Sequence, residues 1–98
     1  MHISYDPTKR EWTLRERELD FEDAAEVFTE RVVTVPDLRH DYGEERHLTF
    51  GWLRSRMVVV VWTPRGEDGR HIISMRKCNA REQARYRQQL GKGGRDDR

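Results

Sequence analysis

Residues 57–77 read MVVVVWTPRGEDGRHIISMRK, and this stretch sets the interpretation of the whole chain. Its first part, 57–63, is β-branched and apolar on both faces, which is typical of a strand in the middle of a sheet. The segment PRGEDG supplies turn residues, and 70–76 alternates in a strand-like way. We therefore predict that 57–63 and 70–76 pair as an antiparallel β-hairpin.

Further strands are predicted on the N-terminal side of this hairpin. The segment ERHLTFGWLR alternates so that Arg46, Leu48, Phe50, Trp52 and Arg54 share one face, with His47, Thr49, Gly51 and Leu53 opposite. RVVTV, ended by a proline, and HISY near the N-terminus are the remaining strand candidates. The same alternation in 70–76 predicts Arg70, Ile72, Ser74 and Arg76 on one face and His71, Ile73 and Met75 on the other.

Helices are predicted where capping residues precede amphipathic or charged segments. Asp6 and Pro7 start a helix that runs to about residue 18, Asp20 caps the short segment FEDAAEVF, and Asn79 caps a last helix that ends at Gly91. The order of elements predicts one small α+β domain over 1–90. We expect two N-terminal helices and a C-terminal helix packed on one face of an antiparallel sheet of about four strands. Residues 91–98, with no apolar side chain after the glycine, are predicted to form a disordered tail.

Charge is distributed unevenly along the 98 residues. Residues 70–98 hold nine Lys and Arg against three Asp and Glu, a net charge of +6, whereas residues 1–69 hold ten against fifteen, a net charge of −5. A basic C-terminal part favours a polyanionic partner, although a solvated basic helix would have the same composition. The sequence has neither a membrane-spanning apolar run nor a signal peptide, so we expect a soluble cytoplasmic protein without a membrane partner.

Several kinds of site are disfavoured by the sequence. The single cysteine, Cys78, excludes an internal disulfide and a multi-cysteine metal site, and its place between a strand and a helix favours a buried structural role. Asp37, His40, Asp41 and Glu44 form the best cluster for a hard metal ion, but a polar loop of this composition is usually only solvated. No glycine-rich phosphate loop follows a strand. We therefore predict no metal and no cofactor.

The basic side chains are the best candidates for a functional site. Arg46, Arg54, Arg70 and Arg76 would line one side of the sheet if their strands are neighbours, and the planar guanidinium fork suits phosphate. On the last helix, Tyr86 lies among Arg81 and Arg85, where its ring would stack on a base. The alternative is that these arginines pair with the acidic residues of the N-terminal part.

Four stretches resemble the BrnT toxins of type II toxin–antitoxin modules. They are YDPTK (5–9), LDFEDAAEVF (19–28), GEERHLTFG (43–51) and VVVVWTPRGEDGRHIISMRKCNAREQARY (58–86). The resemblance implies a RelE-like fold and a metal-independent endoribonuclease that cleaves RNA and arrests translation. It also implies a BrnA-like ribbon-helix-helix antitoxin, through which the complex binds operator DNA.

Two departures from the family pattern bear on activity. Where the family has Asn-Leu-Arg-Lys-His-Gly at the end of the first helix, this chain has Thr13 to Glu18, so the Lys-His pair is replaced by Glu16 and Arg17. Glu18 replaces the glycine, and we expect the helix to end differently because a left-handed cap penalises a side chain. The family's arginine before Ile-Ile-Ser is His71 here, with Arg70 one place earlier.

Metal-independent RNA cleavage needs charge stabilisation at the phosphate and proton transfer. We assign the first to Arg46, Arg76 and Lys77, with Arg70 in support. His71 or His47 is the candidate acid or base, because histidine is the residue type that titrates near neutrality, and Glu45 is the carboxylate alternative. Arg54, Arg81, Arg85 and Tyr86 are expected to bind RNA. The alternative function is a catalytically degenerate module that only binds RNA or an antitoxin.

Overall fold

The computed structural model describes residues 1–91 and contains a five-stranded sheet in the order β1-β5-β4-β3-β2. The strands are β1 (His2–Tyr5), β2 (Val32–Pro36), β3 (His47–Leu53), β4 (Arg56–Arg65) and β5 (Gly69–Lys77). The helices are α1 (Pro7–Arg17), α2 (Ala24–Thr29) and α3 (Ala80–Leu90), with a 3-10 turn η1 (Phe21–Asp23) before α2. The tail predicted for 91–98 lies outside the described residues except for Gly91.

The predicted hairpin is confirmed, and β4 is the central strand of the sheet. Val58, Val59 and Val60 of β4 are completely buried, which explains why this strand is apolar on both faces. β4 pairs with β5 on one side and with β3 on the other, both antiparallel. β1, however, pairs with β5 in parallel, through His2 opposite Gly69 and Tyr5 opposite Ile72. The sheet is therefore mixed and five-stranded, and the prediction of about four antiparallel strands was wrong.

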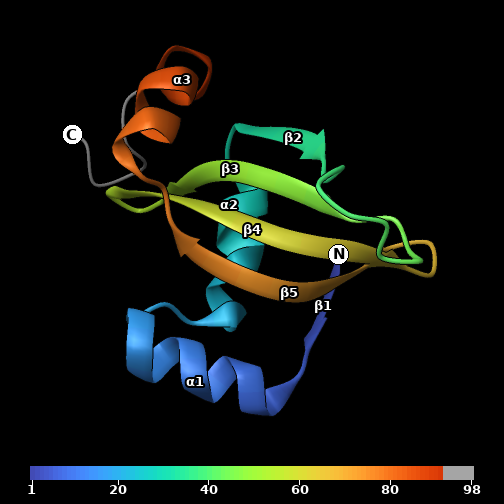
Figure 1. Ribbon diagram of the computed structural model, residues 1–98. Coiled ribbons are helices and arrows are strands. Elements are labelled where there is room, and N and C mark those ends of the chain that lie inside the picture. The colour runs from blue at the N-terminus through green and yellow to red at the C-terminus, as the bar shows by residue number, and fades with distance from the viewer. Residues whose placement is uncertain (92–98) are drawn as a thin grey trace.

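Helices cover both faces of the sheet, whereas one covered face was predicted (Figure 1). On one face, η1 and α2 bury Phe21, Ala24 and Val27 against β4 and β5 in a first core cluster. On the other, α3 buries Tyr86 and Leu90 in a second cluster, which also contains Phe50, Met57, Val59 and Cys78. We call the first the α2 face and the second the α3 face. The two faces need separate cores because β4 is apolar on both sides.

The helix ends follow the predicted caps with one exception. The Asp6 carboxylate accepts a hydrogen bond from Thr8 N–H, and Asn79 forms a reciprocal capping box with Glu82. The exception is Glu18, which ends α1 in the left-handed conformation, with φ 58° and its N–H bonded to Leu14 O. The helix thus ends as it would with glycine, and the expectation of a different ending was wrong. The strain of a left-handed side chain is retained at this position.

A β-bulge in β5 changes which side chains share a face. Val61 of β4 lies opposite Ser74 and Trp62 lies opposite Ile72, so Ile73 has no partner on β4. Ile72 and Met75, three positions apart, consequently both face α2 in the first cluster. The grouping of residues 70–72 with residues 74–76 that simple alternation predicted was therefore wrong.

Candidate functional site

The bulge distributes the basic residues of β5 over both faces of the sheet. Ile3 and Tyr5 of β1 pack in the first cluster, so Ser4 points to the α3 face together with its register partner His71. Arg76 follows the buried Met75 and also belongs to the α3 face, where it contacts α3. Arg70 lies on the α2 face. The bulge thus brings His71 to the same face as Arg76 and separates Arg70 from both.

Arg76 is bound to the first turn of α3 by a bidentate ion pair. Its two terminal nitrogens donate to the two carboxylate oxygens of Glu82, each at 2.9 Å. These hydrogen bonds lower the pKa of Glu82 and raise that of Arg76. The Arg76 side chain is still 40% exposed, so the fork is held in place while one side of it stays open to solvent.

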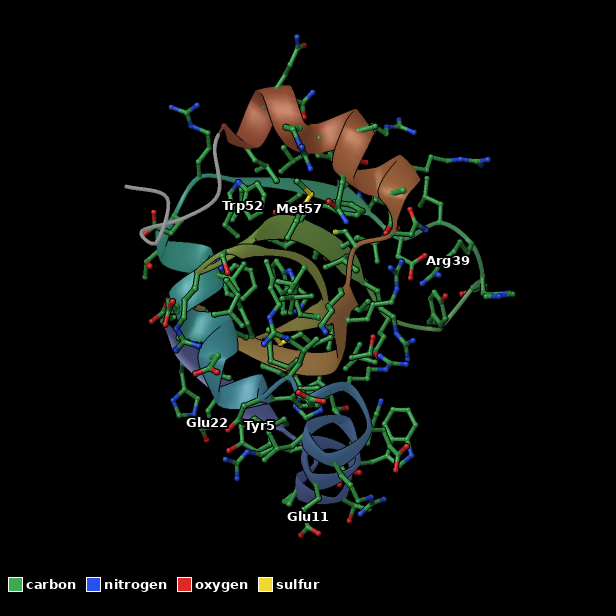
Figure 2. The ribbon with its side chains drawn as sticks, turned by 90° about the vertical axis from the view of Figure 1, so that its left-hand side faces the viewer. Tyr5, Glu11, Glu22, Arg39, Trp52 and Met57 are labelled. Atoms are coloured by element: carbon green, nitrogen blue, oxygen red, sulfur yellow. The ribbon has the colours of Figure 1, made fainter. Side chains whose placement is uncertain are left out.

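Arg39 is a second cation on this face, and sequence reasoning missed it. Its guanidinium donates to both oxygens of the buried Asp37 carboxylate, at 2.8 and 2.7 Å, which holds the pKa of Asp37 far below its usual range. The Arg39 side chain is 61% exposed, and its charge acts against the raised pKa of Arg76. The positive charge of Arg39 therefore acts at Arg76, and Figure 2 labels Arg39 on the loop at the right-hand side of that view.

The loop that carries Arg39 also holds Arg46 in place. The Arg46 guanidinium lies 3.9 Å from the centre of the Tyr42 ring and donates to Glu44 at 3.3 Å. Its carbonyl accepts from Asp37 N–H, so Arg46 and Arg39 are supported by the same loop. The metal cluster considered for this loop does not assemble, because Asp37 is occupied by Arg39. Within residues 1–91, no group of three or more His, Cys, Asp or Glu side chains is placed to hold a metal ion.

His71 lies at the β1 end of the α3 face. Its Nδ1 is 2.9 Å from the Ser4 hydroxyl, a bond that fixes the orientation of the ring. His71 is opposite Thr63, whose hydroxyl donates to Glu45 O just before Arg46. The imidazole is therefore held on the β1 side, and its register partner Thr63 is hydrogen-bonded to the loop that carries the arginines.

The other predicted catalytic residues lie on the α2 face. Arg70 sits over two aromatic rings, 4.2 Å from the centre of Phe28 and 4.8 Å from that of Trp62. His47 packs against the same Trp62 ring and its Nε2 is 2.7 Å from a Glu45 carboxylate oxygen. The structure thus gives these three residues partners of their own, and it does not bring Arg70, His47 or Glu45 to Arg76.

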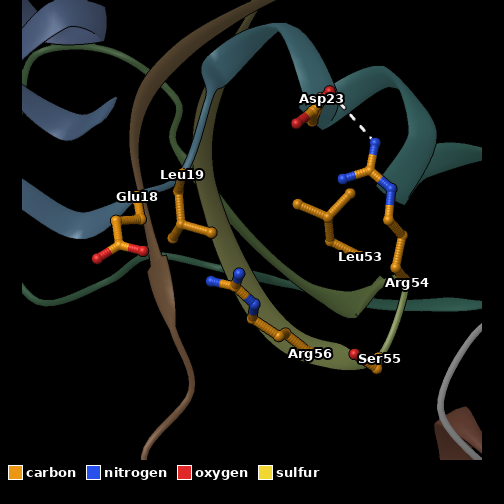
Figure 3. Close-up of a pocket in the computed structure, with 7 residues that line it drawn as sticks. All are labelled: Glu18, Leu19, Asp23, Leu53, Arg54, Ser55 and Arg56. Atoms are coloured by element: carbon orange, nitrogen blue, oxygen red, sulfur yellow. Dashed lines mark ion pairs between the residues drawn. The ribbon is translucent and has the colours of Figure 1, made fainter. Parts of the chain in front are cut away.

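Of the predicted RNA-binding residues, Arg81 and Arg85 are exposed on α3, but the other two are engaged elsewhere. Tyr86 is only 8% exposed and stacks on Phe50 at 4.2 Å between ring centres, so its ring is part of the core and is not presented to a base. Arg54 is in the tight turn between β3 and β4, where it pairs on the α2 face with Glu26 at 3.2 Å and with Asp23 at 3.8 Å. Figure 3 shows the pair with Asp23.

Lys77 and Arg76 border a surface hollow at the end of α1. The hollow is also lined by Glu16, Arg17 and Glu18, and Arg17 donates to Met75 O at 2.9 Å. The two positions at which the family pattern has Lys-His are therefore beside the basic end of β5. In this chain those positions are Glu16 and Arg17, which place one carboxylate and one guanidinium at that end of the strand.

Cys78 is buried at the end of β5 and is 5% exposed. Burial raises the pKa of its thiol to about 12, with a smaller contribution from the nearby Glu82 carboxylate. A thiol in this state is protonated at neutral pH, which agrees with the structural role expected from its position.

No helix within residues 1–91 combines the length and the apolar character needed to cross a lipid bilayer.

Comparison with the curated proteins found no match. Among solved structures, the chain is similar to the Brucella abortus ribonuclease toxin BrnT, with 26% sequence identity, a TM-score of 0.66, and coverage of 81% of this chain and 97% of that chain. A family model described as "Ribonuclease toxin, BrnT, of type II toxin-antitoxin system" matches residues 5–82. The chain belongs to the BrnT family of ribonuclease toxins of type II toxin–antitoxin systems.

Proposed function

We propose that this toxin is a RelE-like, metal-independent endoribonuclease in the cytoplasm, and that it cleaves RNA on the α3 face of the sheet. The observation that carries the proposal is the set of cations from two elements on that face. Arg76 comes from β5, whereas Arg39 and Arg46 come from the loop before β3. Each is held by a carboxylate or a ring, so little reorganisation is needed when a phosphate binds.

In this mechanism the arginine forks bind the scissile phosphate and stabilise the charge that develops when the ribose 2′-hydroxyl attacks. Arg76 and Arg39 are the central groups, because each is held by a carboxylate and keeps an exposed side. His71, oriented by Ser4, accepts the 2′-hydroxyl proton or protonates the leaving 5′-oxygen. Lys77, beside Arg76, adds positive charge at the edge of the site. Arg81 and Arg85 extend the basic surface along α3 for the rest of the RNA.

Arg70, His47, Glu45, Arg54 and Tyr86 are left out of this mechanism. Arg70 and His47 pack on Trp62, Glu45 pairs with His47, and Arg54 pairs with acidic residues of η1 and α2. Each of these contacts gives the residue a structural role. We infer that the arginines of this chain have two kinds of role: some bind RNA, and others pair with acidic or aromatic residues and stabilise the fold.

The proposed partner is a BrnA-like ribbon-helix-helix antitoxin, which would carry the complex to operator DNA. We expect it to cover part of 70–90, where exposed arginines of α3 offer a docking surface for acidic residues. Hydrogen exchange with and without the antitoxin tests this, and unchanged protection throughout 70–90 would rule out that surface.

The direct test is cleavage of a labelled RNA by the purified protein in the presence of a chelator. We expect cleavage that leaves a 2′,3′-cyclic phosphate, and no cleavage of the same oligonucleotide with 2′-methoxy groups. A requirement for added divalent metal, or equal cleavage of the 2′-methoxy RNA, would contradict the mechanism.

The alternative function is an RNA- or antitoxin-binding module without activity. One observation favours it: both terminal nitrogens of Arg76 already donate to the Glu82 carboxylate. Under this alternative, the 2′-methoxy RNA binds as well as the unmodified RNA but neither is cut under any condition.

A further inference from the structure

A second hollow lies on the α3 side, where the turn between β3 and β4 meets the end of β5 and α3. Its volume is about 300 Å³. The residues that line it are Trp52, Ser55, Arg56, Met57, Lys77, Cys78, Gln83 and Arg87. It therefore has three basic side chains, and none of its lining residues among 1–91 is acidic. Its neighbours each include two carboxylates, Glu18 with Asp23 in one and Glu16 with Glu18 in the other.

Within the described part of the chain, the three cations of this hollow have no carboxylate in an ion pair with them. No ion pair within residues 1–91 joins Arg56, Lys77 or Arg87 to a carboxylate, in contrast to Arg39, Arg46 and Arg76. Among residues 1–91, Arg87 donates to the neutral Gln83, at 3.1 Å. Positive groups that converge without an internal counter-charge create a local potential that favours an external anion.

Arg56 and Ser55 line this hollow and also the neighbouring one, which Figure 3 shows. In that view the Arg56 side chain extends toward Leu19 and Glu18. It is exposed, and exposed side chains change rotamer within nanoseconds, so an anion in the cationic hollow can recruit it. Lys77 and Arg87 are the groups already at that hollow.

The position of the hollow indicates which anion it takes. Lys77 lines both this hollow and the one bordered by Arg76, so the two hollows adjoin at the end of β5. Trp52 lies near the other end of α3 (Figure 2), where its indole N–H donates to Gly91 O, and it adds an aromatic wall. A phosphate beside an aromatic side chain is the pattern with which proteins bind single-stranded nucleic acid.

From these observations we propose that the hollow of Arg56, Lys77 and Arg87 is a phosphate subsite for the RNA strand next to the scissile bond. This inference rests on the proposed function for the identity of the strand. The subsite itself does no chemistry, because it holds no group for proton transfer. It binds the backbone and thereby sets the register of the RNA on the toxin.

The test is binding of a non-cleavable 2′-methoxy RNA by the double variant Arg56→Gln/Arg87→Gln. Lys77 is kept, because it also borders Arg76. For single strands the logarithm of the affinity falls with the logarithm of the salt concentration by about 0.7 per phosphate contact. Loss of two contacts should reduce the magnitude of this slope by about 1.4. Binding near 0.1 M salt should then be about 25-fold weaker. Restoring charge with Arg56→Lys/Arg87→Lys should restore most of the slope.

The matched control is Lys9→Gln, because Lys9 is an exposed cation near the start of α1 that does not line this hollow. Equal affinity and slope for the double variant and this control would overturn the subsite, as would absence of RNA binding by the wild type. Unchanged RNA binding combined with weaker antitoxin binding would also overturn it. A reduced slope in a protein that never cleaves RNA would support the subsite and count against the proposed function.

Discussion

The substitution Arg76→Ala separates the catalytic and structural roles of the cation at the end of β5. It removes two hydrogen bonds of 2.9 Å to Glu82 between side chains that are 40% and 20% exposed. A partly solvated bidentate pair contributes about 1 kcal/mol. The capping box remains, since Glu82 still accepts from Asn79 N–H, so α3 keeps its start. We expect the melting temperature to fall by roughly 4–8 °C.

Cleavage should respond much more strongly than stability. Loss of one group that stabilises developing charge costs on the order of 10²–10³ in rate, or about 2.7–4 kcal/mol. Arg76→Lys should recover only part of the rate, because a point charge does not reproduce the fork. The matched control is Glu82→Gln, which breaks the same ion pair but keeps Arg76 and a residue suited to the capping box. It should lose similar stability and retain most of the cleavage.

The pH dependence of stability gives an independent check. Arg76 lowers the pKa of Glu82 from its ordinary value of 4.5 in the folded protein. A group whose pKa is lowered on folding stabilises the fold above its unfolded pKa, and this contribution disappears as the pH falls through the folded pKa. The difference in melting temperature between wild type and Arg76→Ala should thus have its largest value at pH 7 and decrease below about pH 4.5. A folded Arg76→Ala protein with undiminished cleavage would refute the catalytic role, as would equal loss of cleavage in Glu82→Gln.

Three further outcomes follow from the fold. Tyr86→Ala should lower the free energy of urea unfolding by about 3–5 kcal/mol, because it removes the ring stacked on Phe50. Tyr86→Phe should retain RNA affinity, and a loss of affinity in this variant would show that the Tyr86 hydroxyl contacts RNA. Glu18→Gly should raise the free energy of unfolding by up to about 1 kcal/mol, since glycine adopts the left-handed conformation without strain; a lower melting temperature would contradict this. Cys78 should resist alkylation at pH 8 until the protein is unfolded, and rapid labelling of the native state would be inconsistent with its buried, protonated thiol.

The parts of the fold that sequence predicts well depend on local signals. The valine run of β4 identifies a central strand because both of its faces must be buried, and the structure places β4 third among five strands. Asp6, Asp20 and Asn79 cap the elements that follow them, as their side-chain chemistry requires. These features involve residues only a few positions apart, so they are visible without knowledge of the tertiary structure.

The parts that sequence missed depend on distant partners. β1 has only four residues, and its parallel pairing joins His2 to Gly69 across most of the chain. The periodicity of a four-residue strand does not indicate whether the strand pairs in parallel or antiparallel. Arg39 was missed because its loop looks merely polar. Only the fold shows that Asp37 is buried and that it holds the exposed side chain of Arg39.

The bulge at Ile73 explains why a correct strand assignment gave an incorrect site. Strict alternation would group Arg70 with Arg76 and leave His71 on the opposite face with Met75. One unpaired residue reverses this grouping, so that His71 joins Arg76 on the α3 face and Arg70 packs on Phe28 and Trp62. The family resemblance expects an arginine where this chain has His71. The bulge therefore puts an imidazole on the same face of the sheet as the proposed phosphate site, five positions from Arg76 along β5, and the neighbouring Arg70 retains a cation that stabilises the α2 face.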